Sequence, residues 1–177
     1  MRPLTLDDLL PLAEYATRRA EFADSHRQYC ERYRRVHIGA HVTLTFQNRQ
    51  TLWFRVQEML RVMCLVDESL VQRELEICNR LLPRRNHLVA GLSHAGLASL
   101  LLEQRRVPGQ LAATTPEDQA LGVASWVDFS LAGSDTVRFI DPDVSAVIEF
   151  EGDGAQLPDE LRQSLIDDLM MSDREAA

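Results

Sequence analysis

The stretch TLWFRVQEMLRVMCLV, from Thr51 to Val66, constrains the fold more than any other part of the sequence. Wound as a helix, it carries apolar side chains on most of its sides, and such a helix must be largely surrounded by other elements. Asn48 stands where a residue that caps the start of a helix is expected. The sequence therefore predicts a buried core helix that begins just after Asn48.

Further helices are predicted before and after the core helix. Thr5 and Asp8 have the spacing of a capping box, and a longer helix is expected to restart near Pro11. Asp67 can cap the helix that follows the core helix, and Pro83 would stop it. The predicted helices cover roughly residues 11–34, 51–66, 68–82, 96–106 and 157–171.

Strands are predicted where β-branched and aromatic residues alternate or gather between turn residues. The segment HVTLTF leads into the core helix, and HLVAGLSH follows the third long helix. The remainder of the chain is mostly β in character. The predicted strands cover 41–46, 87–94, 110–115, 122–132 and 145–150.

The order of these elements predicts the fold class. Helices come first, strands dominate later, and no regular βαβ alternation occurs, so we expect an α+β fold in which helices pack on one face of about five antiparallel strands. We expect one domain, 1–177. It is divided into a helical N-terminal arm (1–35), a mixed strand and helix core (36–106) and a mostly β part with a C-terminal helix (107–177).

Composition restricts the class of protein. The chain has 177 residues, of which 45% are hydrophobic and 26% charged, so it is large and apolar enough to fold without disulfides or metals. No apolar run reaches the length of a membrane span, and three widely spaced cysteines give no disulfide framework. We therefore expect a cytoplasmic protein that does not bind membranes.

Charge is unevenly distributed along the chain. The net charge is -8, which argues against nucleic acid as a partner. Residues 141–177 are strongly acidic, whereas the stretch RQYCERYRRVHIG is basic. Arg32, Arg34 and Arg35 in that stretch are candidates for a surface that binds an acidic partner, that binds the acidic end of the same chain, or that is merely solvated.

Five polar residues at the junction after Phe46 are candidates for a ligand site: Asn48, Arg49, Gln57, Glu58 and Arg61. The last three can share one side of the core helix, and the start of that helix adds positive field, so the set could bind an anion. The structural interpretation is the stronger one. Asn48 would cap the helix, and Glu58 would pair with Arg61 because charges in a buried helix are normally paired.

Other residues give weaker indications of chemistry. His26 and Cys30 are four residues apart on one helix, a spacing that suits two metal ligands, but two ligands do not make a site and we expect no metal. Cys64 and Cys78 fit structural positions. The sequence contains no GxSxG, P-loop, GxGxxG or HExxH motif, and we expect no cofactor.

The segments LTLDDLLPLAEY, FQNRQTLWFRVQEMLRV and VDESLVQRELEICNRLLPRRNHLVAGL resemble a bacterial family, the domain-of-unknown-function family numbered 3501. Together they span about the first half of the chain. In the second half, the segment IEFEGDGAQLPDE stands where the family carries a longer β segment ending near His-Pro. The resemblance implies no activity. It does imply neighbours, because such proteins are often encoded beside rubrerythrin-like di-iron proteins and iron-sulfur oxidoreductases.

Two functions from different classes follow. The first is an accessory or interaction protein that supports an iron-dependent redox or peroxide-defence system, with a rubrerythrin-like or iron-sulfur protein as the partner that the resemblance suggests. The second is a small-molecule or metal-binding enzyme whose polar site lies at the strand-to-helix junction after Phe46. Whether the chain is catalytic stays open at this point.

Overall fold

The computed structural model describes residues 1–40, 42–84, 87–94, 125–130, 147–150 and 153–174. In chain order the elements are η1 (Leu6–Asp8), α1 (Leu12–Tyr33), β1 (Arg35–Ile38), β2 (Val42–Phe46), α2 (Arg49–Met63), α3 (Glu68–Asn79), β3 (His87–His94), β4 (Ser125–Ser130), β5 (Val147–Phe150), β6 (Asp153–Gln156) and α7 (Asp159–Arg174). The fold is α+β, as predicted. The predicted helix over 96–106 and strand over 110–115 lie outside the described residues.

The strands form two groups. Strands β1, β2, β3 and β4 make an antiparallel sheet in that order, and β5 pairs with β6 as a separate two-stranded ribbon. Within the described residues, the expected sheet of about five strands is thus a sheet of four and a ribbon of two. Strand β1 was not predicted, because only its two residues Val36 and Ile38 alternate inward.

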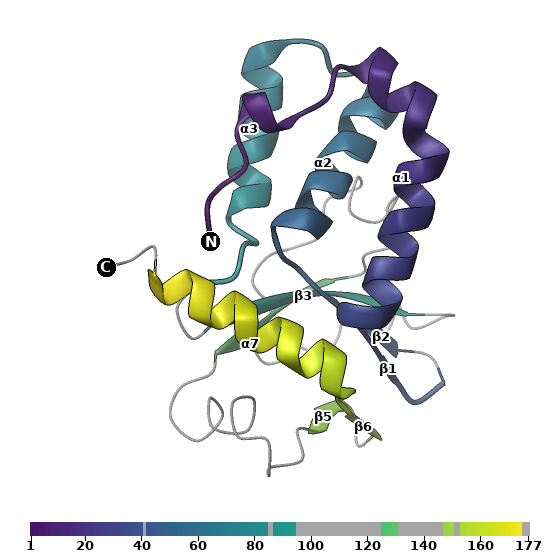
Figure 1. Cartoon of the computed structure of the whole chain (residues 1–177), viewed down its shortest axis with the longest axis vertical. Coiled ribbons are helices and arrows are strands. Elements are labelled where there is room, and N and C mark those ends of the chain that lie inside the picture. The colour runs from purple at the N-terminus through teal and green to yellow at the C-terminus, as the bar shows by residue number, and fades with distance from the viewer. Residues whose placement is uncertain (41, 85–86, 95–124, 131–146, 151–152, 175–177) are drawn as a thin grey trace.

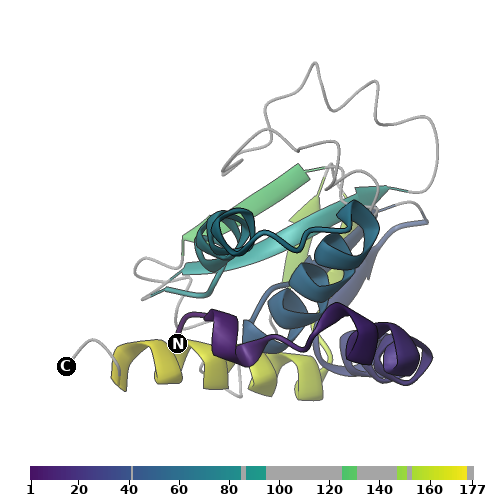
Figure 2. The ribbon, with the colours of Figure 1, turned by 90° about the horizontal axis from the view of Figure 1, so that it is seen from above.

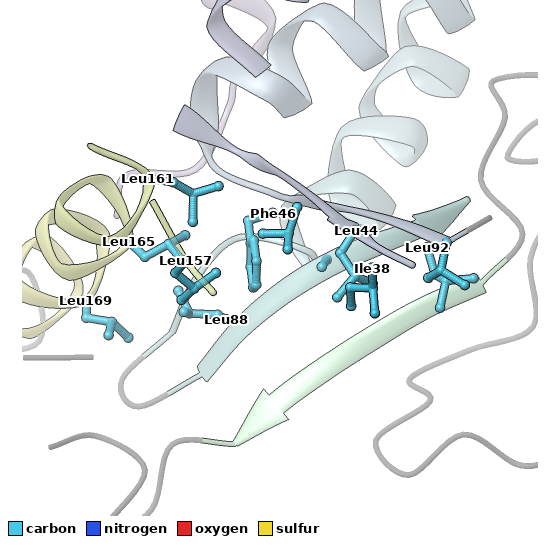
Figure 3. Packing of buried hydrophobic residues seen from close by; sticks show 12 residues of the cluster. Ile38, Leu44, Phe46, Leu88, Leu92, Leu157, Leu161, Leu165 and Leu169 are labelled. Carbon is cyan, nitrogen blue, oxygen red and sulfur yellow. The ribbon is translucent and has the colours of Figure 1, made fainter. Parts of the chain in front are cut away.

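One face of the sheet is apolar, and α7 covers it. Alternate residues of β1, β2 and β3 point to that face, which is the period that a half-buried strand requires. Leucines four residues apart along α7 point back at them (Figure 3). The buried cluster consists of Val36, Ile38, Val42, Leu44, Phe46, Leu88, Ala90, Leu92, Leu157, Leu161, Leu165 and Leu169.

A second apolar cluster lies in the helical layer. Figure 1 shows α1, α2 and α3 side by side above the sheet, and Figure 2 shows α7 along one side of it. The second cluster joins α2 and α3 to the N-terminal segment, and its buried members are Leu4, Leu52, Val56, Met59, Leu60, Val71, Leu75, Cys78 and Leu82. Among the described helices, only α7 contributes to the buried cluster of the sheet.

The predicted helix starts are confirmed in atomic detail. The backbone N–H of Thr5 donates to the Asp8 carboxylate over 2.8 Å. Asn48 Oδ1 accepts hydrogen bonds from the backbone of Gln50 and Thr51 at the start of α2. Asp67 caps α3 in the same way. No helix of the described chain is long and apolar enough to cross a bilayer.

Candidate functional site

Asn48 uses both ends of its side chain within the molecule. Its Oδ1 atom accepts from the backbone N–H groups of Gln50 (3.1 Å) and Thr51 (3.0 Å), and Thr51 Oγ1 accepts from the backbone of Asn48 (2.9 Å). Its amide nitrogen donates to the hydroxyl of Tyr29 over 2.8 Å. Asn48 therefore caps α2 and joins it to α1, which leaves the side chain no free group for a ligand.

Arg49 fastens the N-terminal turn to α2. Its guanidinium lies 2.5 Å from Asp8 Oδ1, and this hydrogen bond is the main cause that holds the pKa of Asp8 well below its usual range. The backbone carbonyl of Asp8 in turn accepts from the indole N–H of Trp53 over 2.8 Å. Two side chains of α2 thus hold η1 in place: Arg49 binds the carboxylate of Asp8, and Trp53 binds its backbone carbonyl.

Gln57 is a residue of α2, and its side chain is fully buried next to the start of α1. Its amide nitrogen donates to the carbonyl of Leu10 over 3.2 Å, just before the helix begins. Its Oε1 atom is buried and accepts no hydrogen bond from the described residues. A buried acceptor without a donor is unfavourable, so Oε1 is an atom that a water or another polar group would stabilise.

Glu58 is the centre of the most extensive polar network in the described chain. Its side chain is 6% exposed, yet it is ionised and fully engaged. Tyr15 donates to it over 2.9 Å, Arg19 over 2.9 and 3.0 Å, and Arg61 over 3.0 and 3.1 Å. Both carboxylate oxygens therefore accept hydrogen bonds, and the network ties α1 to α2.

The electrostatics of this network favour a permanently charged carboxylate. Burial alone would raise the pKa of Glu58, but hydrogen bonds from Arg61, Arg19 and Tyr15 outweigh it and lower the pKa from 4.5 to about 2. Burial and the hydrogen bond to Glu58 raise the pKa of Tyr15 above its ordinary value. Neither group is poised to exchange a proton near neutral pH, as a general acid or base would be.

The five candidate residues do not converge on one point. Asn48 and Arg49 lie at the start of α2, whereas Glu58 and Arg61 lie near its end. Ten residues separate Asn48 from Glu58, which is about 15 Å along a helix axis. Asn48, Arg49 and Glu58 contact different parts of the N-terminal region, and Arg61 joins Glu58 through the i,i+3 pair that the sequence suggested.

His26 and Cys30 lie together in the partly buried space between α1 and α2. Cys30 Sγ is 3.4 Å from His26 Nε2, and the imidazole stacks on the ring of Phe54 with centroids 4.0 Å apart. Burial lowers the pKa of His26 to about 4 and raises the pKa of Cys30 to about 11. In the part of the chain that the structure describes, no three His, Cys, Asp or Glu side chains are grouped to hold a metal.

The three arginines proposed as a partner surface occupy different environments. Arg34 is 2% exposed, so it cannot serve as a surface residue. It donates to Asp168 and to Ser164 of α7 and to Tyr29 of α1. The reason is its position as the capping residue directly after α1, where the chain turns into the sheet and α7 passes close by.

Arg32 and Arg35 remain at the surface but have partners within the chain. Arg32 pairs with Glu160 at the start of α7 over 2.5 and 2.6 Å. Arg35 pairs with Glu31, one helical turn earlier. Three interpretations of the basic stretch were open. The ion pairs of Arg32 with Glu160 and of Arg34 with Asp168 correspond to the second of them, contact with the acidic end of the same chain.

Comparison with known proteins decides the family. The model of the family described as "Protein of unknown function (DUF3501)" matches residues 3–94, about half of the chain. The chain belongs to the DUF3501 family. A crystal structure of a novel protein of unknown function from Burkholderia pseudomallei K96243 is similar to it, with a TM-score of 0.75 and 25% identity over 95% of this chain and 100% of that one. No curated protein matches the chain.

Residues outside the predicted set complete these DUF3501 networks. Tyr15 and Arg19 are four apart on α1, so their common direction was readable from the sequence, but the carboxylate that they share was not. Tyr29 lies on the same helical spacing as Tyr15 and Arg19, but its partners Arg34 and Asn48 could not be read from it. Asp168 had no sequence signal. Tyr29 and Asp168 are recruited by contacts between α1, α2 and α7, three segments far apart along the chain.

Proposed function

We propose that this DUF3501 protein is a cytoplasmic accessory or interaction protein without catalysis of its own, and that it supports an iron-dependent redox or peroxide-defence system. The absence of catalysis is supported by one observation: both carboxylate oxygens of Glu58 already accept hydrogen bonds from Tyr15, Arg19 and Arg61. The most polar cluster of the matched family segment is occupied by contacts between helices. A substrate would have to displace several charge-assisted hydrogen bonds to reach it.

The link to iron rests on the resemblance to the family and on the di-iron and iron-sulfur proteins associated with such proteins. We propose a rubrerythrin-like or iron-sulfur protein as the partner. An accessory role requires a stable shape and an accessible surface, and the chain offers both: polar networks fix α1 on α2 and α7 on α1, while apolar side chains remain exposed elsewhere.

The experiment is co-purification from the native host at the natural expression level, with partners identified by mass spectrometry and bound iron measured in the recovered complex. We expect a rubrerythrin-like or iron-sulfur protein to be recovered with the chain. A deletion strain should lose resistance to hydrogen peroxide. Recovery of the protein only as a free species, together with a deletion strain of normal peroxide resistance, would contradict the proposal.

Complementation of that deletion separates an accessory role from an enzymatic one. The double variant Glu58→Gln, Arg61→Met removes the charges of this pair, leaves that of Arg19, and retains most of the side-chain volume. Provided that circular dichroism shows it to be folded at the growth temperature, an accessory protein should still restore resistance. A folded variant that fails to do so would favour a site at Glu58.

The second candidate is a small-molecule or metal-binding enzyme with its site at the junction after Phe46. Buried polar atoms favour it, because Gln57 Oε1 and Arg49 Nε have no hydrogen-bond partner among the described residues. A ligand held there should raise the melting temperature of the wild type, and Gln57→Leu should abolish that shift. Thermal-shift measurements with metal ions and common metabolites test this directly.

A further inference from the structure

The connection between α2 and α3 exposes an unusual concentration of apolar side chains. Val62 is 56% exposed, Met63 41%, Val66 84% and Leu70 46%. We call these four residues the apolar tip. The connection between α2 and α3, in or beside which they fall in the sequence, lies at the end of the helical layer farthest from the sheet (Figure 1). Isolated exposed apolar residues are common, but four of them within nine residues at one end of the helical layer make this end a candidate contact surface.

The backbone at this end is also unusual. Cys64, the residue directly after α2, adopts the left-handed conformation with φ 50°, and it is the only non-glycine residue of the described chain with positive φ. Glycine takes this position most easily, and a side chain there costs about 1 kcal/mol. The tight turn places the exposed thiol of Cys64 among the residues of the apolar tip.

Charge differs between the two sides of the apolar tip. On the α2 side, Arg19 and Arg61 share the single carboxylate of Glu58, which leaves one unit of positive charge at partly exposed side chains. On the α3 side, Asp67 and Glu68 are exposed and form no ion pair with described residues. The apolar tip therefore has a positive edge and a negative edge.

We propose that the apolar tip is the contact surface between two copies of this chain related by a twofold axis. Such an axis brings the same patch of both copies together, so the apolar side chains of one meet those of the other. It also lays the end of α2 in one copy against the start of α3 in its partner. The positive edge at Arg61 then faces the negative edge at Asp67 and Glu68, twice.

The same charges disfavour the obvious other occupant, a membrane. The surface of a cytoplasmic leaflet is negative, and it would repel the carboxylates of Asp67 and Glu68 as well as a chain of net charge -8. A second copy carries both the positive and the negative edge, so it complements the charges of the apolar tip. The self-association is independent of the proposed redox partner, which could bind either the single chain or the pair.

Sedimentation velocity of the full chain over a wide range of concentrations tests the proposal. We expect a species with twice the mass of one chain at the higher concentrations. Val66→Glu and Leu70→Glu should each raise the Kd by about tenfold or more, because each buries a charge in the contact. Gln72→Glu is the matched control: it adds the same charge to an exposed position on another face of α3 and should leave the Kd unchanged.

Two further measurements locate the contact. A short bis-maleimide reagent should link two copies through Cys64, the exposed cysteine, and Cys64→Ser should abolish the product, since Cys30 and Cys78 are buried. Glu68→Arg should weaken self-association by a smaller factor, and added salt should weaken the wild type in the same direction, because both act on the charged edges.

A chain that sediments as a single copy at every concentration would overturn the proposal, as would a pair whose Kd is unchanged in Val66→Glu and Leu70→Glu. Circular dichroism of both variants guards against loss of folding. Binding of the single-copy wild type to vesicles of anionic phospholipid, lost in Val66→Glu, would assign the apolar tip to a membrane instead. Capture of a different protein by the tip, without self-association, would equally refute it.

Discussion

The sheet region and the helical region of this protein are stabilised in different ways. The sheet region buries one continuous cluster of apolar side chains between β1–β3 and α7 (Figure 3). The helical region has an apolar cluster of its own between α2 and α3, whereas only Tyr15 and Cys30 are buried among the 22 residues of α1. Helix α1 is attached to α2 through the polar network of Glu58 and through ring contacts with Trp53 and Phe54. The sheet region depends on burial of aliphatic and aromatic side chains, whereas the interface of α1 with α2 combines specific polar contacts with a few ring contacts.

This difference explains the polar residues of the family segment. A helix with few buried apolar residues gains less from the hydrophobic effect, so hydrogen bonds and ion pairs contribute more to fixing its position. Glu58 supplies these from α2 to Tyr15 and Arg19 of α1. Polar residues inside a buried helix resemble an active site in sequence, although here they position a neighbouring helix.

The largest effect is expected in the sheet region. Phe46→Ala removes a fully buried ring from the centre of the apolar cluster and should lower the free energy of unfolding by about 3–5 kcal/mol. Urea denaturation followed by circular dichroism measures this. Phe46→Leu keeps most of the volume and should cost less than about 1.5 kcal/mol. Equal losses for both variants would show that the cluster is loosely packed.

A smaller loss is expected from the polar contacts of the helical region. Glu58→Gln should lower the free energy of unfolding by about 1.5–3 kcal/mol, because charge-assisted hydrogen bonds to two arginines are lost. Glu76→Gln on the exposed side of α3 removes the same charge and serves as the control. If the two variants are equally stable in urea, the network contributes nothing to attaching α1.

Acid should weaken the polar interface before the apolar cluster. The pKa of Glu58 is about 2 in the folded chain and 4.5 in the absence of its partners, so its stabilisation is present above pH 4.5 and is lost as the pH falls towards 2. The difference in free energy of unfolding between wild type and Glu58→Gln should therefore shrink across that range. A difference that stays constant down to pH 2 would mean that the carboxylate is not the stabilising group.

The smallest effect concerns the surface contact between α1 and α7. Arg32→Ala breaks the ion pair with Glu160, but both side chains are more than half exposed and remain solvated without each other. We expect a melting temperature close to that of the wild type, with any difference disappearing in high salt. A large decrease in melting temperature would mean that this exposed ion pair stabilises the fold as strongly as a buried pair such as Arg34 with Asp168.

Much of the fold could be predicted because its signals are local. The caps Asn48 and Asp67, the long helix from about residue 11 to 34 and the strand over 87–94 all depend on neighbouring residues. Strand β1 escaped because it is four residues long and follows a basic helix directly. Two periods of alternation are too few to distinguish a strand from the end of a helix.

The candidate site was predictable only as pairs along one helix. Glu58 and Arg61 form the pair that their spacing indicated. Arg34 was misjudged because nothing in a run of exposed arginines reveals which of them meets α7, and its partner Asp168 lies 134 residues further along the chain. Contacts between residues so far apart in the sequence depend on how the elements pack, and a local sequence pattern does not contain that information.

The covering of the sheet by α7 bears on how the protein is made. Strands β1, β2 and β3 are complete by residue 94, but the leucines that shield their apolar face are synthesised only at 157–169. While the ribosome adds the intervening residues, this apolar face lacks the leucines that cover it in the folded chain, and exposed apolar surface of this kind favours aggregation. All buried residues of the cluster between α2 and α3 have been synthesised once Leu82 is added. This cluster can therefore assemble while translation continues.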